Sequence, residues 1–203
     1  MGFMDDVREE SKKYGGGGSD KYFKFDGKGV YQLRIVAKPK VIATHFFGRG
    51  VPAVVCVGID EGCKFHRETD KKASIKLATY VIDRKDGKIK MAELPLSVSY
   101  SINDLQEDSD FAFSEFPMPY DVKIKYDPDN EDPKAKYRLQ PSPKHTPITD
   151  EEQAGLEAAM KVETPDQYVE KKKERAKGKG EPVSTGSGIE YPTEEINPDD
   201  IPF

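Results

Sequence analysis

The chain has 203 residues, 35% of them apolar and 34% charged, and its formal net charge at pH 7 is −5. Because this apolar fraction is low, we expect one folded region of roughly 120–150 residues with flexible ends. The N-terminus turns acidic at once, and no apolar stretch approaches the ~20 residues of a membrane helix, so we expect neither a secretory signal nor a membrane partner. Two cysteines are too few for a disulfide framework and favour a reducing compartment.

The charged residues are unevenly distributed along the chain. Residues 20–146 carry 22 basic and 19 acidic side chains, a net charge of +3, whereas residues 147–203 carry 7 and 14, a net charge of −7. A mildly basic body can hold a polyanion, and an acidic end can compete with that polyanion or bind something else. The composition predicts four parts in chain order: a flexible leader (1–19), a folded domain (20–146), a helical extension (147–177) and a disordered acidic tail (178–203).

Alternating apolar and polar residues predict strands in the domain. The expected strands cover residues 31–36, 41–47, 75–83, 88–94, 121–126 and 136–139. The sequence Lys85-Asp86-Gly87 is typical of a hairpin turn, and Pro95 before apolar residues of helical period predicts a helix over 96–106. Strands with one inserted helix indicate a mainly β fold, and we predict an OB-fold-like five-stranded Greek-key barrel with short helices.

Two capping boxes predict helices after the domain. Thr149 with Glu152 opens a helix that runs to about Met160, and Thr164 with Gln167 opens a second helix that ends at Gly178. The second helix has little apolar face, so we expect it to be exposed and marginally stable.

Four of the five cysteines and histidines lie within one stretch of 22 residues: His45, Cys56, Cys63 and His66. Thiolate and imidazole are ligands that Zn²⁺ prefers, and four of them close its tetrahedral coordination sphere. Gly58 and Gly62 would let the backbone turn around an ion. We predict a structural zinc loop over residues 45–66. The alternative is two half-buried thiols beside two surface histidines.

Basic and aromatic side chains mix in the domain, as in proteins that hold phosphates in a basic groove and stack bases on aromatic rings. In the last hairpin, Tyr126 and Tyr137 are expected to face the core together with the aliphatic residues. The candidate contact residues, predicted on open strand faces or beside the zinc loop, are Arg34, Phe46, Phe47, Arg49, Lys76, Tyr80, Lys123, Lys125, Lys136 and Arg138. For each residue singly, the alternative is an ordinary solubilising lysine or a core aromatic.

The last five residues are the most specific motif: Asp199, Asp200, Ile201, Pro202 and Phe203. A terminal phenylalanine offers a ring and a free carboxylate on one residue, which a small apolar pocket with a basic lip can hold. The two aspartates would steer the peptide electrostatically. We predict that this tip binds partner proteins.

The tip resembles the acidic end of bacterial single-stranded DNA-binding proteins, which closes with Asp-Asp-Ile-Pro-Phe. The domain resembles phage single-stranded DNA-binding proteins, including the T-even helix-destabilising type, an OB-fold with a zinc loop of His-Cys-Cys-Cys character. His45, Cys56 and Cys63 match the first three of those ligands, whereas His66 stands in place of the fourth cysteine. Bacterial members lack such a loop, so the phage type fits better.

The resemblance implies a non-catalytic protein that coats and protects single-stranded DNA during phage replication, recombination and repair. It implies single-stranded DNA and host or phage replication and repair proteins as partners, in the cytoplasm of the bacterial host. A monomer that assembles cooperatively on DNA agrees with this expectation. The alternative function is a zinc-stabilised nuclease or a processivity factor that docks through the same tail.

Overall fold

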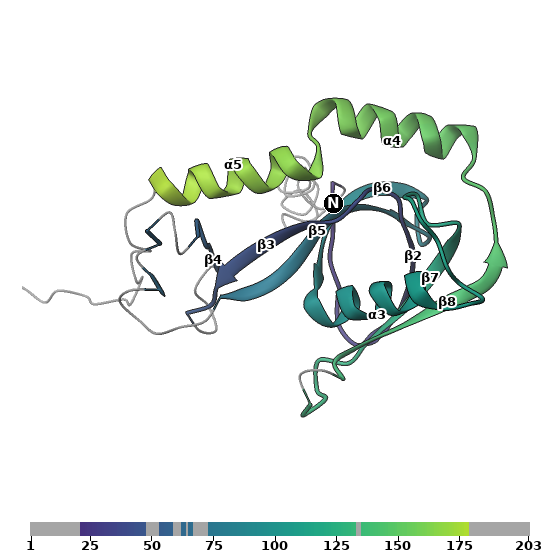
Figure 1. The fold of residues 1–203 in the computed structure, drawn as a ribbon, viewed down its shortest axis with the longest axis horizontal. Coiled ribbons are helices and arrows are strands. Elements are labelled where there is room, and N and C mark those ends of the chain that lie inside the picture. The colour runs from purple at the N-terminus through teal and green to yellow at the C-terminus, as the bar shows by residue number, and fades with distance from the viewer. Residues whose placement is uncertain are drawn as a thin grey trace, which may run out of the picture.

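The computed structural model describes residues 21–47, 53–58, 62–63, 65–66, 73–132 and 135–178 (Figure 1). The predicted leader and almost all of the predicted tail lie outside these residues. None of the described helices is long and apolar enough to cross a membrane. Within the described part, the chain is mainly β, with one mixed sheet and three helices.

The strands are β1 (Tyr22–Phe23), β2 (Gly29–Ile35), β3 (Lys40–His45), β4 (Val54–Val55), β5 (Ser74–Asp83), β6 (Lys88–Pro95), β7 (Tyr120–Tyr126) and β8 (Tyr137–His145). The helices are α3 (Leu96–Glu107), α4 (Asp150–Val162) and α5 (Pro165–Gly178). Every strand and helix that the sequence predicted is present with small shifts at the ends, except that β8 runs six residues beyond its predicted end at residue 139. The sheet has eight strands instead of five. Alternation could not reveal β1 and β4, because each is only two residues long.

The sheet runs in the order β1-β6-β5-β2-β7-β8 and curls around a core, so that β1 and β8 are its two edges (Figure 1). β5 is the central strand: β6 pairs along one side, and β3 and then β2 share the other side. Away from the curled part, β3 and β5 continue as a ribbon that carries β4 at its far end (Figure 1). Pro141 and Pro143 fit in β8 because an edge strand does not need every N–H group.

An inner core fills the concave side of the sheet. Leu33 and Ile35 of β2, Leu94 of β6 and Val122 and Ile124 of β7 are fully buried there. Helix α3 closes this core with Val98, Ile102 and Leu105, as its helical period predicted. The predicted turn after β5 is confirmed, since Gly87 has a positive φ of 71° and its N–H donates to the Asp83 carbonyl at 2.8 Å.

A second core lies on the outer face of the sheet, under α4 and α5. Ile82 of β5 and Met91 of β6 pack there against Leu156 of α4 and against Tyr168 and Val169 of α5. The expectation of an exposed second helix is therefore wrong for one face, where Tyr168 and Val169 meet the sheet, although most of its other residues are exposed or half-buried. Its capping hydrogen bonds between Thr164 and Gln167 are formed.

The helices also cover two of the predicted contact residues, so the prediction is wrong for both. Arg34 is fully buried: its Nε donates to Asp121 at 2.8 Å, and its Nη1 donates to the Thr146 carbonyl at 2.5 Å. Tyr80 is buried in the outer core, and its hydroxyl donates to the Glu163 carbonyl at 2.8 Å. Both residues do point away from the inner core. However, the helical extension covers that face, so neither is open to a ligand.

Candidate metal centre and nucleic-acid interface

The four predicted metal ligands converge at the end of the β3–β5 ribbon. Strand β3 ends at His45, Cys56 follows β4, and Cys63 and His66 lie in the turn beyond. Their ligand atoms all lie within 4.8 Å of one another, and the first three residues are buried. Both cysteines are free thiols. This cluster can hold a metal ion.

The spacing of the ligand atoms suits a tetrahedral ion. Sγ of Cys63 lies 3.4 Å from Nε2 of His45, and Sγ of Cys56 lies 3.6 Å from Nδ1 of His66. For zinc, bonds of about 2.3 Å to sulfur and about 2.05 Å to nitrogen at tetrahedral angles place these atoms about 3.6 Å apart. The two measured edges agree with that value, so one ion of this size can reach all four ligands without large rearrangement.

The backbone turns at the two glycines of the loop, as the sequence predicted, and this turn places the ligands. Gly58 and Gly62 have positive φ angles of 119° and 77°, which side chains rarely allow. The Cys63 N–H donates to the Gly58 carbonyl at 3.0 Å, and the His66 N–H donates to the Cys63 carbonyl at 3.2 Å. The loop therefore folds back twice and presents Cys63 and His66 from one tight turn.

Burial keeps the Cys56 thiol protonated when no cation is bound. Burial raises the pKa of the Cys56 thiol, and the neighbouring Cys63 raises it further, against the opposing effects of the Gly58 N–H and of Lys173 on α5. Without a cation the thiol therefore stays protonated at neutral pH. A bound metal ion reverses this balance and holds the thiolate.

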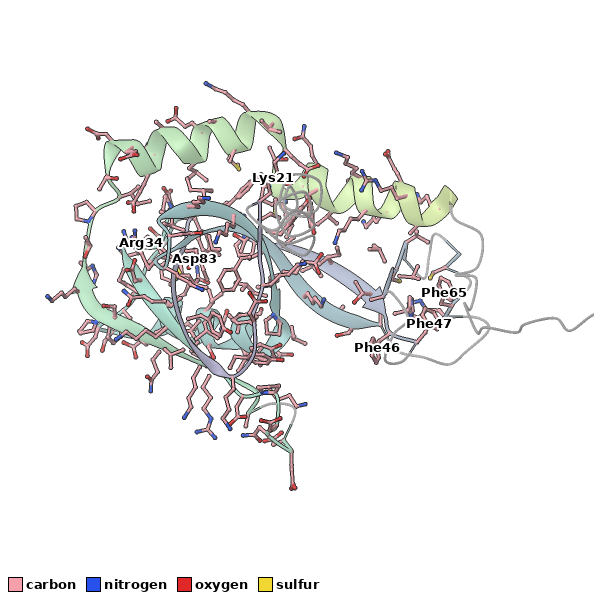
Figure 2. All side chains as sticks on the ribbon, turned by 180° about the vertical axis from the view of Figure 1, so that it is seen from behind. Lys21, Arg34, Phe46, Phe47, Phe65 and Asp83 are labelled. Carbon is pink, nitrogen blue, oxygen red and sulfur yellow. The ribbon has the colours of Figure 1, made fainter. Side chains whose placement is uncertain are left out.

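Aromatic rings surround the cluster. The ring of Phe65 lies 5.4 Å from that of His45 and 4.9 Å from that of Phe47. Figure 2 shows Phe46, Phe47 and Phe65 gathered at this end of the ribbon. Phe47 is half-buried by these contacts, whereas Phe46 is 62% exposed and open to a ligand. Arg49, the predicted basic neighbour, lies outside the described residues.

The predicted basic residues of the last hairpin lie on the outer face of β7 and β8. Lys123, Lys125 and Arg138 are exposed there, and Lys136 is half-buried just before β8. Lys125 pairs in register with Arg138. This surface offers positive charge, but the aromatic residues of the two strands point to their other face.

A cleft of about 520 Å³ lies where the two edges of the curled sheet approach each other. Strand β1 and its continuation form one side, β7 and β8 form another, and α5 overhangs the opening. The aromatic residues of its lining are Tyr22, Phe23, Phe25, Tyr126, Tyr137 and Tyr168, and the basic residues are Lys24, Lys76, Lys171, Lys172 and Arg175. Glu93 and Glu163 are the acidic residues in this lining, so its net charge is +3 in a chain whose net charge is −5.

Packed aromatic rings line the cleft between the two sheet edges. Tyr126 and Tyr137 stack with centroids 4.7 Å apart and an interplanar angle of 17°, and Phe25 contacts Tyr137 at 5.2 Å. Burial raises the pKa of Tyr137 to about 12, so this ring brings no negative charge into the cleft at neutral pH. The cleft thus combines aromatic surface with positive charge, which the outer face of the hairpin does not.

Most residues of this cleft were not predicted as contacts. Alternation placed Tyr126 and Tyr137 on the core side, and Tyr137 does pack against the inner core, but alternation cannot show that a cleft opens beside them. A usable signal was present in α5: Tyr168, Lys171, Lys172 and Arg175 follow one another at helical spacing and share one face. Of the predicted contacts that the structure describes, only Lys76 lines the cleft, where it pairs with Glu93 at 3.2 Å.

Comparisons of the chain with known protein families, with characterised proteins and with solved structures found no match. The functional argument therefore rests on the residues and geometry of the chain itself.

Proposed function

We propose that this chain is a non-catalytic single-stranded DNA-binding protein of the phage type and that the cleft between β1, β8 and α5 holds the strand. The combination of aromatic rings and a +3 net charge in that cleft is the observation that carries the proposal. Proteins that bind single strands pair a basic groove for phosphates with aromatic platforms for bases. A duplex, whose bases are already stacked, cannot use such platforms.

The strand order supports an OB-fold. If β2 and β3 count as one bent strand and the two-residue strands β1 and β4 are set aside, the chain runs through five strands, with α3 between the third strand, β6, and the fourth, β7. The first strand pairs with both the second, β5, and the fourth. This is the connectivity expected of a partly open five-stranded Greek-key barrel that binds oligonucleotides.

We propose Zn²⁺ as the ion of the His45, Cys56, Cys63 and His66 cluster. The donor set of two sulfurs and two nitrogens and the 3.4 and 3.6 Å edges support zinc. Four protein ligands leave no open position, so the role of the ion is structural. It would hold the end of the β3–β5 ribbon next to α5, which packs against β3, β4 and β5.

We further propose that Asp199 to Phe203, which lie outside the described residues, recruit replication and repair proteins of a bacterial host. The argument is the sequence of the tip alone. Together, these proposals describe a protein that coats an exposed strand and brings other enzymes to it.

Oligonucleotide binding tests the central proposal. We would titrate a fluorescent oligo-dT and the corresponding duplex with protein at several salt concentrations, with and without Mg²⁺. The single strand should bind far more tightly and remain intact. Cleavage in Mg²⁺ would favour the nuclease alternative, and equal affinity for the duplex would contradict the proposal.

Two matched double variants locate the strand. Lys171→Ala with Arg175→Ala removes two charges from the cleft, and Lys123→Ala with Lys125→Ala removes two charges from the outer face of β7. Each lost phosphate contact on a single strand lowers the salt slope by about 0.7, so the cleft variant should lower it by about 1.4. A change in the outer variant alone would place the strand on the outer face.

A further inference from the structure

Glu93 is an ionised carboxylate on the wall of a cleft that is otherwise mainly basic. It accepts hydrogen bonds from the Tyr168 hydroxyl at 2.9 Å, from Lys76 Nζ at 3.2 Å and from Lys172 Nζ. Burial alone would raise the pKa of Glu93. The hydrogen bond from Lys172 and the charges of both lysines outweigh burial, so its pKa lies below the ordinary value. The carboxylate is therefore negatively charged at neutral pH.

The two lysines reach this carboxylate from different parts of the fold. Lys76 comes from β5 and Lys172 from α5, and their side chains remain 36% and 33% exposed. Both can therefore meet an anion from solution. An ammonium group can donate to a phosphate oxygen in place of a carboxylate oxygen with similar geometry.

Resting on the proposed function, we propose that Glu93 is an internal counter-anion of the DNA cleft: it holds Lys76 and Lys172 in the free protein, and phosphates of the bound strand displace it. The carboxylate keeps the lysines in place before binding. Once displaced, it stays nearby and repels the phosphates, which limits affinity and speeds release of the strand.

The other acidic residue of the cleft differs from Glu93 in its surroundings. Glu163 pairs with Lys171 at 3.1 Å, and that lysine side chain is 57% exposed. Water and salt screen such an exposed pair, so it has little effect on either partner. The remaining basic residues, Lys24 and Arg175, have no ion pair with Glu93 among the described contacts. Glu93 is therefore the acidic residue whose removal should change binding most.

The test is the affinity of the full-length, zinc-loaded protein for oligo-dT, with and without Glu93→Gln. The variant should bind about three- to ten-fold more tightly at low salt, because one negative charge close to the phosphates is gone. Stopped-flow dissociation should be slower, whereas the salt slope should change little, because both lysines already contact phosphates in the wild-type complex. Glu157→Gln on the exposed side of α4 changes the net charge equally, and it should leave affinity unchanged.

Two further variants separate this role from simple anchoring of α5. Tyr168→Phe removes a hydrogen bond to Glu93 without changing charge, so it should not tighten binding. Lys172→Gln should lower the salt slope by about 0.7, because a displaced lysine meets phosphate. If Glu93→Gln fails to fold, the salt slope of Lys172→Gln tests the counter-anion role of Glu93.

The outcomes are distinct. If the wild type does not bind oligo-dT, the proposed function fails, and this inference fails with it. If the wild type binds, but a folded Glu93→Gln binds equally or more weakly, only the counter-anion role is overturned. An unchanged salt slope in Lys172→Gln would likewise overturn it, because Glu93 and Lys172 would then stay paired on the DNA.

Discussion

The curled sheet and the metal loop, residues 45–66, are ordered by different forces. The sheet buries apolar side chains on both faces, and seven consecutive residues of β5, Leu77 to Asp83, are buried. In the described part of the metal loop, the buried residues are His45, Cys56 and Cys63, all of them candidate ligands. Apolar burial stabilises the sheet without a ligand. The described part of the loop buries no comparable set of apolar side chains, so we expect a bound ion to supply most of its stability.

Zinc removal should give the largest difference between the two regions. Structural zinc contributes about 10–16 kcal/mol of apparent binding free energy in small domains. We expect about one zinc per chain by elemental analysis. Chelation should remove hydrogen-exchange protection from residues 54–66 and leave β2 and β7 protected.

Histidine provides a matched control for this prediction. His66→Ala should lose the metal, whereas His145→Ala should keep it, because His145 is exposed on β8 away from the cluster. Equal protection of the loop with and without metal would show that the ion is not what orders it.

The next largest effect should come from the buried ion network under α4. Asp121 accepts from Arg34 at 2.8 Å and from Arg84 at 3.0 Å, and Arg84 also pairs with Glu152. Asp121→Ala leaves the buried Arg34 without its carboxylate, which should cost about 3–5 kcal/mol in the free energy of unfolding. Urea denaturation measures this cost.

An exposed ion pair gives the matching control. Asp166 pairs with Lys40 at 2.7 Å, but its side chain is 62% exposed. Asp166→Ala should cost no more than about 1 kcal/mol. Similar losses of unfolding free energy in the two variants would mean that burial of the network does not determine how much it stabilises the fold. Zinc content should stay unchanged in both, because neither residue touches the metal loop.

A substitution at Tyr22 should change DNA binding and not the stability of the fold. Tyr22 is 40% exposed on β1 and lines the cleft. If a base stacks on its ring, Tyr22→Ala should weaken oligo-dT binding by about 1–3 kcal/mol. Tyr100→Ala on α3 removes a more exposed ring of the same type away from the cleft and should have no effect. Equal losses of affinity in both variants would argue against stacking in the cleft.

Acid should destabilise the sheet through the same network. For Asp121, burial raises the pKa, but hydrogen bonds from Arg84 and Gln32 and the charges of both arginines lower it below the ordinary value. A carboxylate with a depressed folded pKa adds stability above its unfolded pKa, near 3.8, and that stability is lost as pH falls through the folded pKa. Unfolding between pH 5 and about 2 should therefore be steeper in the wild type than in Asp121→Asn. Parallel curves would contradict this assignment.

Removal of Asp199 to Phe203 should have the smallest effect on both regions. The tip is negatively charged, so oligo-dT affinity should stay equal or rise slightly at low salt. Capture of bacterial proteins that recognise this terminus should be lost, and Phe203→Ala should lose nearly as much. A pull-down with full-length protein, the truncated form and a form with one added C-terminal residue measures this. Equal recovery by all three would contradict a role for the tip.

Local patterns determined the elements of this protein. Period-two alternation predicted the long strands, and helical period with a preceding proline predicted α3. Two capping boxes predicted α4 and α5, and the Thr149–Glu152 box is formed in full. The metal cluster was also readable, because two of its ligands come from one tight turn and the other two from the nearby end of a ribbon. These signals are local, and local geometry depends mainly on neighbouring residues.

Tertiary structure alone decided which faces stay open. Strand period shows that Arg34 and Leu33 point to opposite sides, but not that α4 would cover the side of Arg34. It also placed Tyr126 and Tyr137 on the core side, where Tyr137 does pack, but nothing local shows that β1 and β8 leave a cleft beside them. That cleft depends on the approach of segments more than 100 residues apart, such as Phe25 and Tyr137. Exposure is a property of the assembled fold, and so is the juxtaposition of Lys76, Glu93 and Lys172 that we propose regulates binding.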